Sequence, residues 1–134
     1  MRRLLSVVVS VYNEEEALAQ FYQVTEGILN TISWDYELVF VNDGSRDQSL
    51  SILNHLADSN PKVKVVSFSR NFGHEAAMIA GIDYSLGDGI ICMDADLQHP
   101  PACIPEIIRR FEDGYEVINM VRTKNESAGW FKNM

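Results

Sequence analysis

Short apolar runs alternate along the chain with segments in which apolar residues recur every three or four positions. Continuous apolar runs of this length are typical of strands that are covered on both faces. The predicted strands are Leu4–Val11, Tyr36–Asn42, Lys64–Phe68, Gly89–Met93 and Glu116–Val121. Strands that alternate with helices form βαβ units, so we predict an α/β fold with a mainly parallel central sheet and helices on both faces.

The segments between the strands carry apolar residues at helical spacing. The stripes are Leu18, Phe21, Tyr22, Thr25, Ile28 and Leu29; Leu50, Leu53 and Leu56; Ala76, Ala77, Ile79 and Ala80; and Ile104, Ile107, Ile108 and Phe111 within a helix over Pro101–Glu112. Asn13 with Glu16, and Ser45 with Gln48, have the spacing of helix N-caps, so we favour a structural role for these four residues.

Polar residues follow four of the predicted strands. They are Ser10–Glu14, Asn42–Ser45, Ser69–His74 and Asp94–Asp96. In doubly wound sheets, ligands bind beyond the carboxyl ends of the strands, at the point where the strand order reverses. The sequence therefore predicts a ligand site along this edge.

Asp94 and Asp96 lie two residues apart directly after the fourth strand. In extended backbone such side chains point to the same side, where they could hold Mg²⁺ or Mn²⁺ together with a diphosphate. Alternatively, Asp96 caps the helix that Pro100 and Pro101 introduce, and Asp94 is a polar strand end. The four polar strand ends favour the metal site.

An aromatic residue beside carboxylates suits a base-stacking and ribose-binding pocket, which is our interpretation of Tyr12, Glu14 and Asp43.

Gly73 opens a predicted helix, where free amides favour an anion, so we predict that Arg70, Asn71 and Gly73 lie near a phosphate or sugar. For His74 alone we favour capping or packing. Arg122 could pair with a phosphate or be a surface charge.

Composition and missing motifs exclude several classes of function. The 134 residues, 46% of them hydrophobic, suit a single domain over residues 1–134, and a net charge of −8 argues against a nucleic-acid partner. A glycine-rich dinucleotide fingerprint and a P-loop are both absent from the sequence, which makes an NAD enzyme or a nucleoside triphosphatase improbable. Cys92 and Cys103 form no C-x-x-C pair, so a disulfide framework or zinc site is not expected.

Four segments in order, Val9–Glu15, Val41–Asp47, Ser69–His74 and Met93–Pro101, resemble family 2 glycosyltransferases. More narrowly, they are similar to the polyprenyl-phosphate glycosyltransferases, over nearly the whole chain. Two departures are Ser10, where many relatives have proline, and Asn42, where many have a second aspartate.

The resemblance implies a GT-A (Rossmann-like) fold with a nucleotide-diphosphate sugar along the strand ends. By family pattern, the nucleotide contacts are Ser10, Tyr12, Glu14, Val41 and Asp43, with Asp94 beside the ribose or metal. The metal ligands are Asp94, Asp96 and Gln98, and the metal is Mg²⁺ or Mn²⁺. The residues of the reaction itself are Asp96, Asp94 and Arg122, with Arg122 near the phosphates.

The implied activity is metal-dependent, inverting transfer of a hexose from a UDP-glucose or GDP-mannose type donor to a polyprenyl phosphate lipid. The lipid phosphate is already largely anionic at neutral pH, so no side chain need act as base. Two alternatives stay open: a soluble family 2 enzyme acting on a saccharide hydroxyl, and a nucleotide-sugar-binding module without catalysis.

No apolar segment approaches the ~18 residues that span a bilayer, so we expect these residues to be soluble. We also expect them to be the N-terminal part of a longer, membrane-associated chain at the cytoplasmic face, whose further residues complete the acceptor site. Oligomerisation is left open.

Overall fold

A computed structural model describes residues 3–95, 101–113, 117–121 and 129–133. The elements, in chain order, are β1 (Leu4–Val11), α1 (Leu18–Leu29), β2 (Asp35–Asn42), α2 (Ser49–Ser59), β3 (Val63–Ser67), α3 (His74–Tyr84), β4 (Gly89–Asp94), the 3₁₀ turn η1 (Pro101–Cys103), α4 (Ile104–Glu112), β5 (Val117–Val121) and β6 (Gly129–Asn133).

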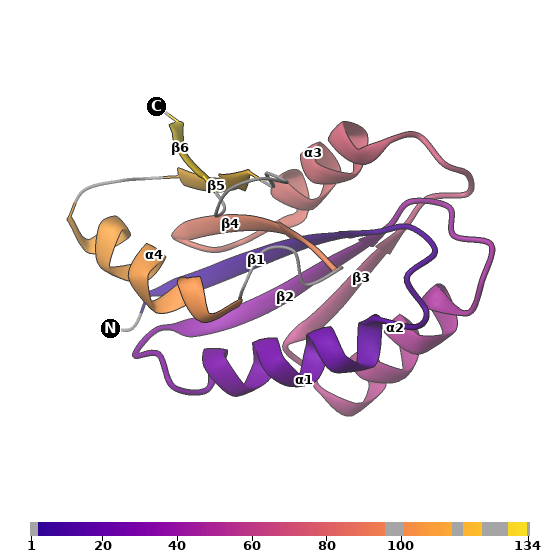
Figure 1. Cartoon of the computed structure of the whole chain (residues 1–134), viewed down its shortest axis with the longest axis horizontal. Coiled ribbons are helices and arrows are strands. Elements are labelled where there is room, and N and C mark those ends of the chain that lie inside the picture. Colours follow the sequence, from indigo (N-terminus) through magenta and orange to yellow (C-terminus); the bar gives the residue numbers. More distant parts are fainter. Residues whose placement is uncertain (1–2, 96–100, 114–116, 122–128, 134) are drawn as a thin grey trace.

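The described strands form one sheet in the order β3-β2-β1-β4-β5-β6 (Figure 1). The first five of these are parallel neighbours, and β6 runs antiparallel to β5. The order runs one way from β1 to β3 and the other way from β4 onward, so it reverses between β1 and β4. This junction is the switch point at which a doubly wound sheet binds its ligands.

Helices cover both faces of the sheet, as the alternating pattern predicts (Figure 1). One core joins α1, α2 and α4 to the odd-numbered side chains of β1, which include Leu5, Val7 and Val9. The second core joins α3 to the opposite face, through Val8 of β1 and Val41 of β2. The strands are therefore buried on both sides, which explains their continuous apolar runs.

Helix α3 packs unusually close to the sheet, and the predicted stripe for this helix was partly wrong. Ile79 is 61% exposed, whereas Ala77 and Gly81, one turn apart, are buried. A Cβ on Gly81 would collide with the side chain of Val8. Small residues, rather than the largest apolar ones, face the sheet because they allow this close approach.

The predicted strands agree with the structure to within one residue at each described boundary, and the predicted stripes of the first two helices lie within α1 and α2. Three differences remain. Strand β6 was not predicted, the fourth helix begins as the 3₁₀ turn η1, and Glu116 lies outside the described residues. Cys92 and Cys103 are free, as expected, and burial raises the pKa of the Cys92 thiol to about 12. Across the described residues, no helix has both the length and the apolar character needed to span a membrane.

Candidate functional site at the switch point

Ser10 and Asp94 lie side by side at the carboxyl ends of β1 and β4. They are partners in the parallel register of the two strands, directly at the switch point. The side chain of Asp94 is 14% exposed. The structure thus brings together a hydroxyl and a carboxylate that are 84 positions apart in the sequence, at the edge where the fold predicts a ligand.

His74, the first residue of α3, reaches across to both of these side chains. Its Nδ1 atom lies 3.2 Å from Ser10 Oγ and 3.5 Å from Asp94 Oδ1. The sequence favoured a capping or packing role for His74, but its side chain is 56% exposed and the helix cap has no side-chain hydrogen bond. Sequence reasoning missed this contact because only the parallel register of β1 and β4 places the two strand ends beside α3.

Asp43 organises the loop that leads into α3. Its carboxylate accepts hydrogen bonds from the amide of Phe72 (2.7 Å), the amide of Gly73 (3.0 Å) and Nδ2 of Asn71 (3.0 Å). Asp43 is only 2% exposed. Three predicted donor-site residues, Asp43, Asn71 and Gly73, therefore contact one another, and their contact with a nucleotide stays a prediction.

Gly44 allows this loop to lie close to the end of β2. Its φ of +70° falls in the left-handed region, and a Cβ there would collide with the backbone of Arg70 and Asn71. A side chain at position 44 would therefore push the loop away from Asp43.

Arg70 lies on the aromatic surface of the same loop. Its guanidinium carbon is 4.0 Å from the centre of the Phe72 ring, and Phe72 packs edge-on against Phe68. Phe72 is 51% exposed. Arg70 thus has a cation–π partner at the rim, a geometry in which a guanidinium keeps its donors for a phosphate.

The loops after β1 and β2 are joined to each other, and the two predicted N-caps were wrong. Ser45 Oγ accepts the amide of Asn13, and Asn13 Oδ1 accepts the amide of Arg46. Helices α1 and α2 begin later, at Leu18 and Ser49, without a side-chain cap. These polar side chains cross-link two loops at one edge instead of closing their own helices.

Gln48, the fourth residue of the second predicted cap, forms a further link between the two loops. Gln48 donates its amide to Glu15, and the amide of Glu15 donates to Asp47. Burial acts to raise the pKa of Asp47, but hydrogen bonds from Ser49 and Glu15 outweigh it and lower the pKa. A charged Asp47 therefore holds the start of α2 against the loop after β1.

The remaining predicted nucleotide contacts occupy different environments. Tyr12 is 43% exposed just beyond β1, and Glu14 donates its amide to Ser49 Oγ at 2.9 Å. Val41 is fully buried under α3. Any contact of Val41 with a nucleotide would therefore come from its backbone.

Asp94 is the one member of the predicted metal trio whose place is known. Asp96, Gln98 and Arg122 lie outside the described residues. Among the residues that are described, no three His, Cys, Asp or Glu side chains come together as a metal site. The hard carboxylate of Asp94, at the strand end and largely shielded, fits one position in the oxygen shell of Mg²⁺ or Mn²⁺.

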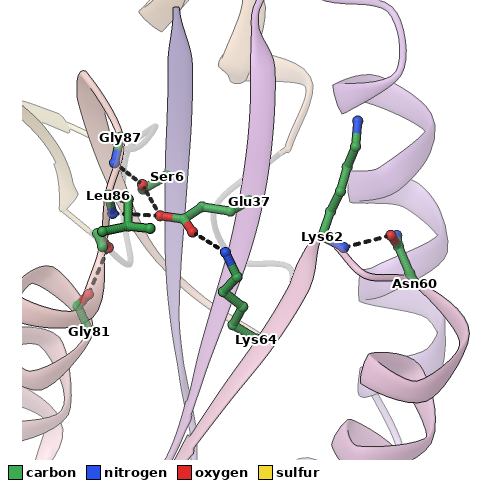
Figure 2. Close-up of polar contacts among 9 residues, drawn as sticks. Ser6, Glu37, Asn60, Lys62, Lys64, Gly81, Leu86 and Gly87 are labelled. Atoms are coloured by element: carbon green, nitrogen blue, oxygen red, sulfur yellow. Dashed lines mark hydrogen bonds and ion pairs between the residues drawn. The ribbon is translucent and has the colours of Figure 1, made fainter.

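A second carboxylate, Glu37, lies near the amino end of β2 and pairs in register with Ser6, as Asp94 pairs with Ser10 on the same face of the sheet. Figure 2 shows its polar contacts. It accepts hydrogen bonds from Ser6 Oγ (2.6 Å), the Leu86 amide (2.7 Å) and Lys64 Nζ (2.9 Å). Ser6 in turn accepts the amide of Gly87. Burial acts to raise the pKa of Glu37, but these hydrogen bonds and the Lys64 charge outweigh it and lower the pKa. Glu37 therefore anchors the turn after α3.

The fold is that of a doubly wound α/β protein with an acidic residue, Asp94, at its switch point. The Glycosyl transferase family 2 model matches residues 6–134, and the chain belongs to this family. It is 47% identical to the uncharacterized glycosyltransferase YkcC of Bacillus subtilis, over 95% of this chain and 39% of that protein. It is 42% identical to a prophage bactoprenol glucosyl transferase homolog of Escherichia coli, over 95% and 44%.

A third relative is the undecaprenyl-phosphate 4-deoxy-4-formamido-L-arabinose transferase of Pseudomonas paraeruginosa, 40% identical over 95% of this chain and 38% of that protein. The chain thus spans 38% to 44% of the length of these relatives. The names of the E. coli and Pseudomonas relatives agree with the resemblance to polyprenyl-phosphate enzymes seen in the sequence.

Solved structures show that the fold is the GT-A fold. The first 349 residues of S. aureus TarS, in complex with UDP-GlcNAc, align with a TM-score of 0.61 at 24% identity, over 79% of this chain and 32% of that one. The mannosyltransferase PcManGT of Pyrobaculum calidifontis, in complex with GDP-Man and Mn²⁺, aligns with a TM-score of 0.59 at 22% identity, over 72% and 28%.

Proposed function

We propose that this chain is the donor-binding part of a metal-dependent, inverting glycosyltransferase that transfers a hexose from a nucleotide-diphosphate sugar to a polyprenyl phosphate. The observation that carries the proposal is the pairing of Ser10 with Asp94 across the switch point. It puts a shielded carboxylate where a doubly wound sheet receives the phosphates of its ligand.

The donor has to be held against a chain of net charge −8. A diphosphate beside Asp94 needs positive charge or amide donors to offset the repulsion. Arg70, placed on the ring of Phe72, is one cation at this edge. A bound Mg²⁺ or Mn²⁺ would supply the rest and would stabilise the negative charge that develops on the leaving diphosphate.

Asp94 would hold the cation together with Asp96 and Gln98, and Arg122 would contact the phosphates. Tyr12, half-exposed beyond β1, offers a ring on which the base could stack. The loop that Asp43 holds in place, from Asn71 to Gly73, borders the same edge. We expect a UDP-sugar ahead of a GDP-sugar.

The acceptor assignment rests on the named activities of the relatives. Two of them are named for bactoprenol or undecaprenyl phosphate. A lipid phosphate oxygen, anionic near neutral pH, would attack the anomeric carbon as the bond to the diphosphate breaks, inverting that carbon. The proposal therefore needs no general base, and the membrane contact would come from residues beyond this chain.

The test is calorimetric titration of the protein with UDP and with GDP, each with and without Mn²⁺. We expect UDP to bind only when Mn²⁺ is present, and we expect Asp96→Ala to abolish that binding. Asp58→Ala is the matched control, because Asp58 is exposed on α2, away from the switch point.

Failure of a folded wild-type sample to bind either nucleotide would overturn the donor-site proposal. Nucleotide binding that ignores Mn²⁺ and Asp96 would overturn the metal part alone. In a radiolabel transfer assay, product on polyprenyl phosphate supports the proposed acceptor. Product only on a saccharide, or none, would support the soluble enzyme or the binding module.

A further inference from the structure

We propose that His74 is a positioning residue of the donor site, and this inference rests on the proposed function. Its Nδ1 atom holds the Ser10 hydroxyl and the Asp94 carboxylate together, and so fixes the direction in which Asp94 presents its oxygens to the cation. Neither the sequence pattern nor the resemblance assigns His74 this role.

The two distances favour one position for the imidazole proton. Nδ1 lies 3.2 Å from Ser10 Oγ and 3.5 Å from Asp94 Oδ1. A bare lone pair on Nδ1 would face the negative oxygen of Asp94 and be repelled. An N–H on Nδ1 can instead be shared between the hydroxyl and the carboxylate, and it is attracted to both. We therefore assign the proton to Nδ1.

The contact joins three separate elements. Ser10 ends β1, Asp94 ends β4, and His74 begins α3. Gly73, just before the histidine, is fixed by the carboxylate of Asp43. The imidazole is therefore held from its backbone by the Asp43 loop, and it in turn holds a side chain on each strand that borders the switch point.

Packing does not explain the position of His74. Its side chain is 56% exposed, and His74 belongs to neither hydrophobic core. Removal of a side chain that orients a metal-binding carboxylate typically lowers metal affinity by about 10- to 100-fold. This size of effect is what a positioning role predicts for His74.

The first test measures Mn²⁺ affinity in the presence of saturating UDP, by calorimetry, for His74→Ala, His74→Asn and His74→Gln. The side-chain amide of asparagine can place an N–H near the position of Nδ1, whereas glutamine places it farther out. We expect a loss of about tenfold for the alanine and glutamine variants, and near wild-type affinity for asparagine. His55→Ala, on the exposed face of α2, is the matched control.

The second test needs neither nucleotide nor metal. Nitrogen-15 NMR at pH 8 should show the imidazole proton of His74 on Nδ1. The Nδ1 shift should respond to Asp94→Asn and not to Asp58→Asn.

The two tests separate failure of this inference from failure of the proposed function. Unchanged Mn²⁺ affinity in all three variants, or a proton on Nε2 instead of Nδ1, would overturn the role of His74. If asparagine fails as badly as alanine, the shared N–H is wrong. If wild type binds no nucleotide while the NMR shows the Nδ1 contact, the donor-site proposal fails and the contact stands.

Discussion

Each end of helix α3 lies next to a carboxylate on the same face of the sheet, but the two carboxylates differ in their exposure and in their neighbours. Beyond the carboxyl end of the helix, Glu37 is 2% exposed and accepts hydrogen bonds from a hydroxyl, an amide and an ammonium group. At the amino end, Asp94 meets the half-exposed ring of His74. Ser6 and Ser10, the partners of these carboxylates on β1, are four residues apart, or about 13 Å.

The difference separates a buried carboxylate near the start of the strands from a partly exposed one at their carboxyl ends. Glu37 is satisfied by groups of its own chain, at the edge where parallel strands begin. Asp94 lies where the strands end, next to an exposed side chain and beside the loop that Asp43 orders. Residue type alone does not distinguish them, because both are acids on central strands. Their positions along the strands distinguish them.

The largest effect is expected for Glu37→Ala. The change leaves the Leu86 amide and the Ser6 hydroxyl without their shared acceptor, and each unsatisfied buried group costs about 1–3 kcal/mol. We expect the free energy of unfolding to fall by about 3 kcal/mol, measured by urea denaturation.

Lys64→Met is the control for Glu37→Ala, and it should cost less than about 1 kcal/mol, since Lys64 is 35% exposed. Folded Glu37→Ala should bind UDP and Mn²⁺ like wild type. Weakened binding would show that the two ends of α3 are coupled.

A somewhat smaller effect is expected for Gly81→Ala, in the middle of α3. The added methyl group would collide with Val8, and overpacking of this kind costs about 1–3 kcal/mol. Removal of a helical glycine returns up to about 1 kcal/mol, so we expect a net loss of about 1–2 kcal/mol in urea denaturation.

Gly27→Ala in α1 separates the cost of overpacking from the gain in helix propensity, because a Cβ at Gly27 meets nothing within 4 Å. This variant should be as stable as wild type or up to about 1 kcal/mol more stable. Equal effects at both glycines would mean that the close packing of α3 on β1 contributes nothing.

Asp94→Asn should act on binding and leave stability nearly unchanged. Loss of the negative charge should weaken Mn²⁺-dependent UDP binding at least tenfold, which is about 1.4 kcal/mol, measured by calorimetry. Asp58→Asn should bind as wild type does. A large drop in the melting temperature of Asp94→Asn, without a change in affinity, would make Asp94 the structural carboxylate of the two.

The smallest effect is expected for the pH dependence of stability. Because folding lowers the pKa of Glu37, its charge stabilises the protein above the unfolded pKa of about 4.3, and this stabilisation is lost as the pH falls through the folded pKa. The stability difference between wild type and Glu37→Gln should therefore be constant near neutral pH and shrink below pH 4.3. A difference that stays constant down to pH 3 would contradict the lowered pKa.

Several parts of this molecule could be predicted from sequence because they depend on local chemistry. Continuous apolar runs located the strands, and the polar residues after them predicted which edge of the sheet faces a ligand. The α3 stripe and the two N-caps were wrong because they depend on neighbours: Gly81 has to fit against Val8, and Asn13 and Ser45 bond across two loops. The antiparallel partner of β5 gave no recognised signal.

By itself, the sequence determined the α/β class, the order of the elements and the family, since periodicity and motif order are properties of the chain alone. Only the tertiary structure decided which acid is buried near the start of the strands and which lies at the switch point. It placed Glu37 beside Ser6 and Leu86, and it placed Asp94 beside Ser10 and His74. The reason is physical: strand order and register bring together groups that are far apart in sequence, and the environment of a carboxylate depends on those groups.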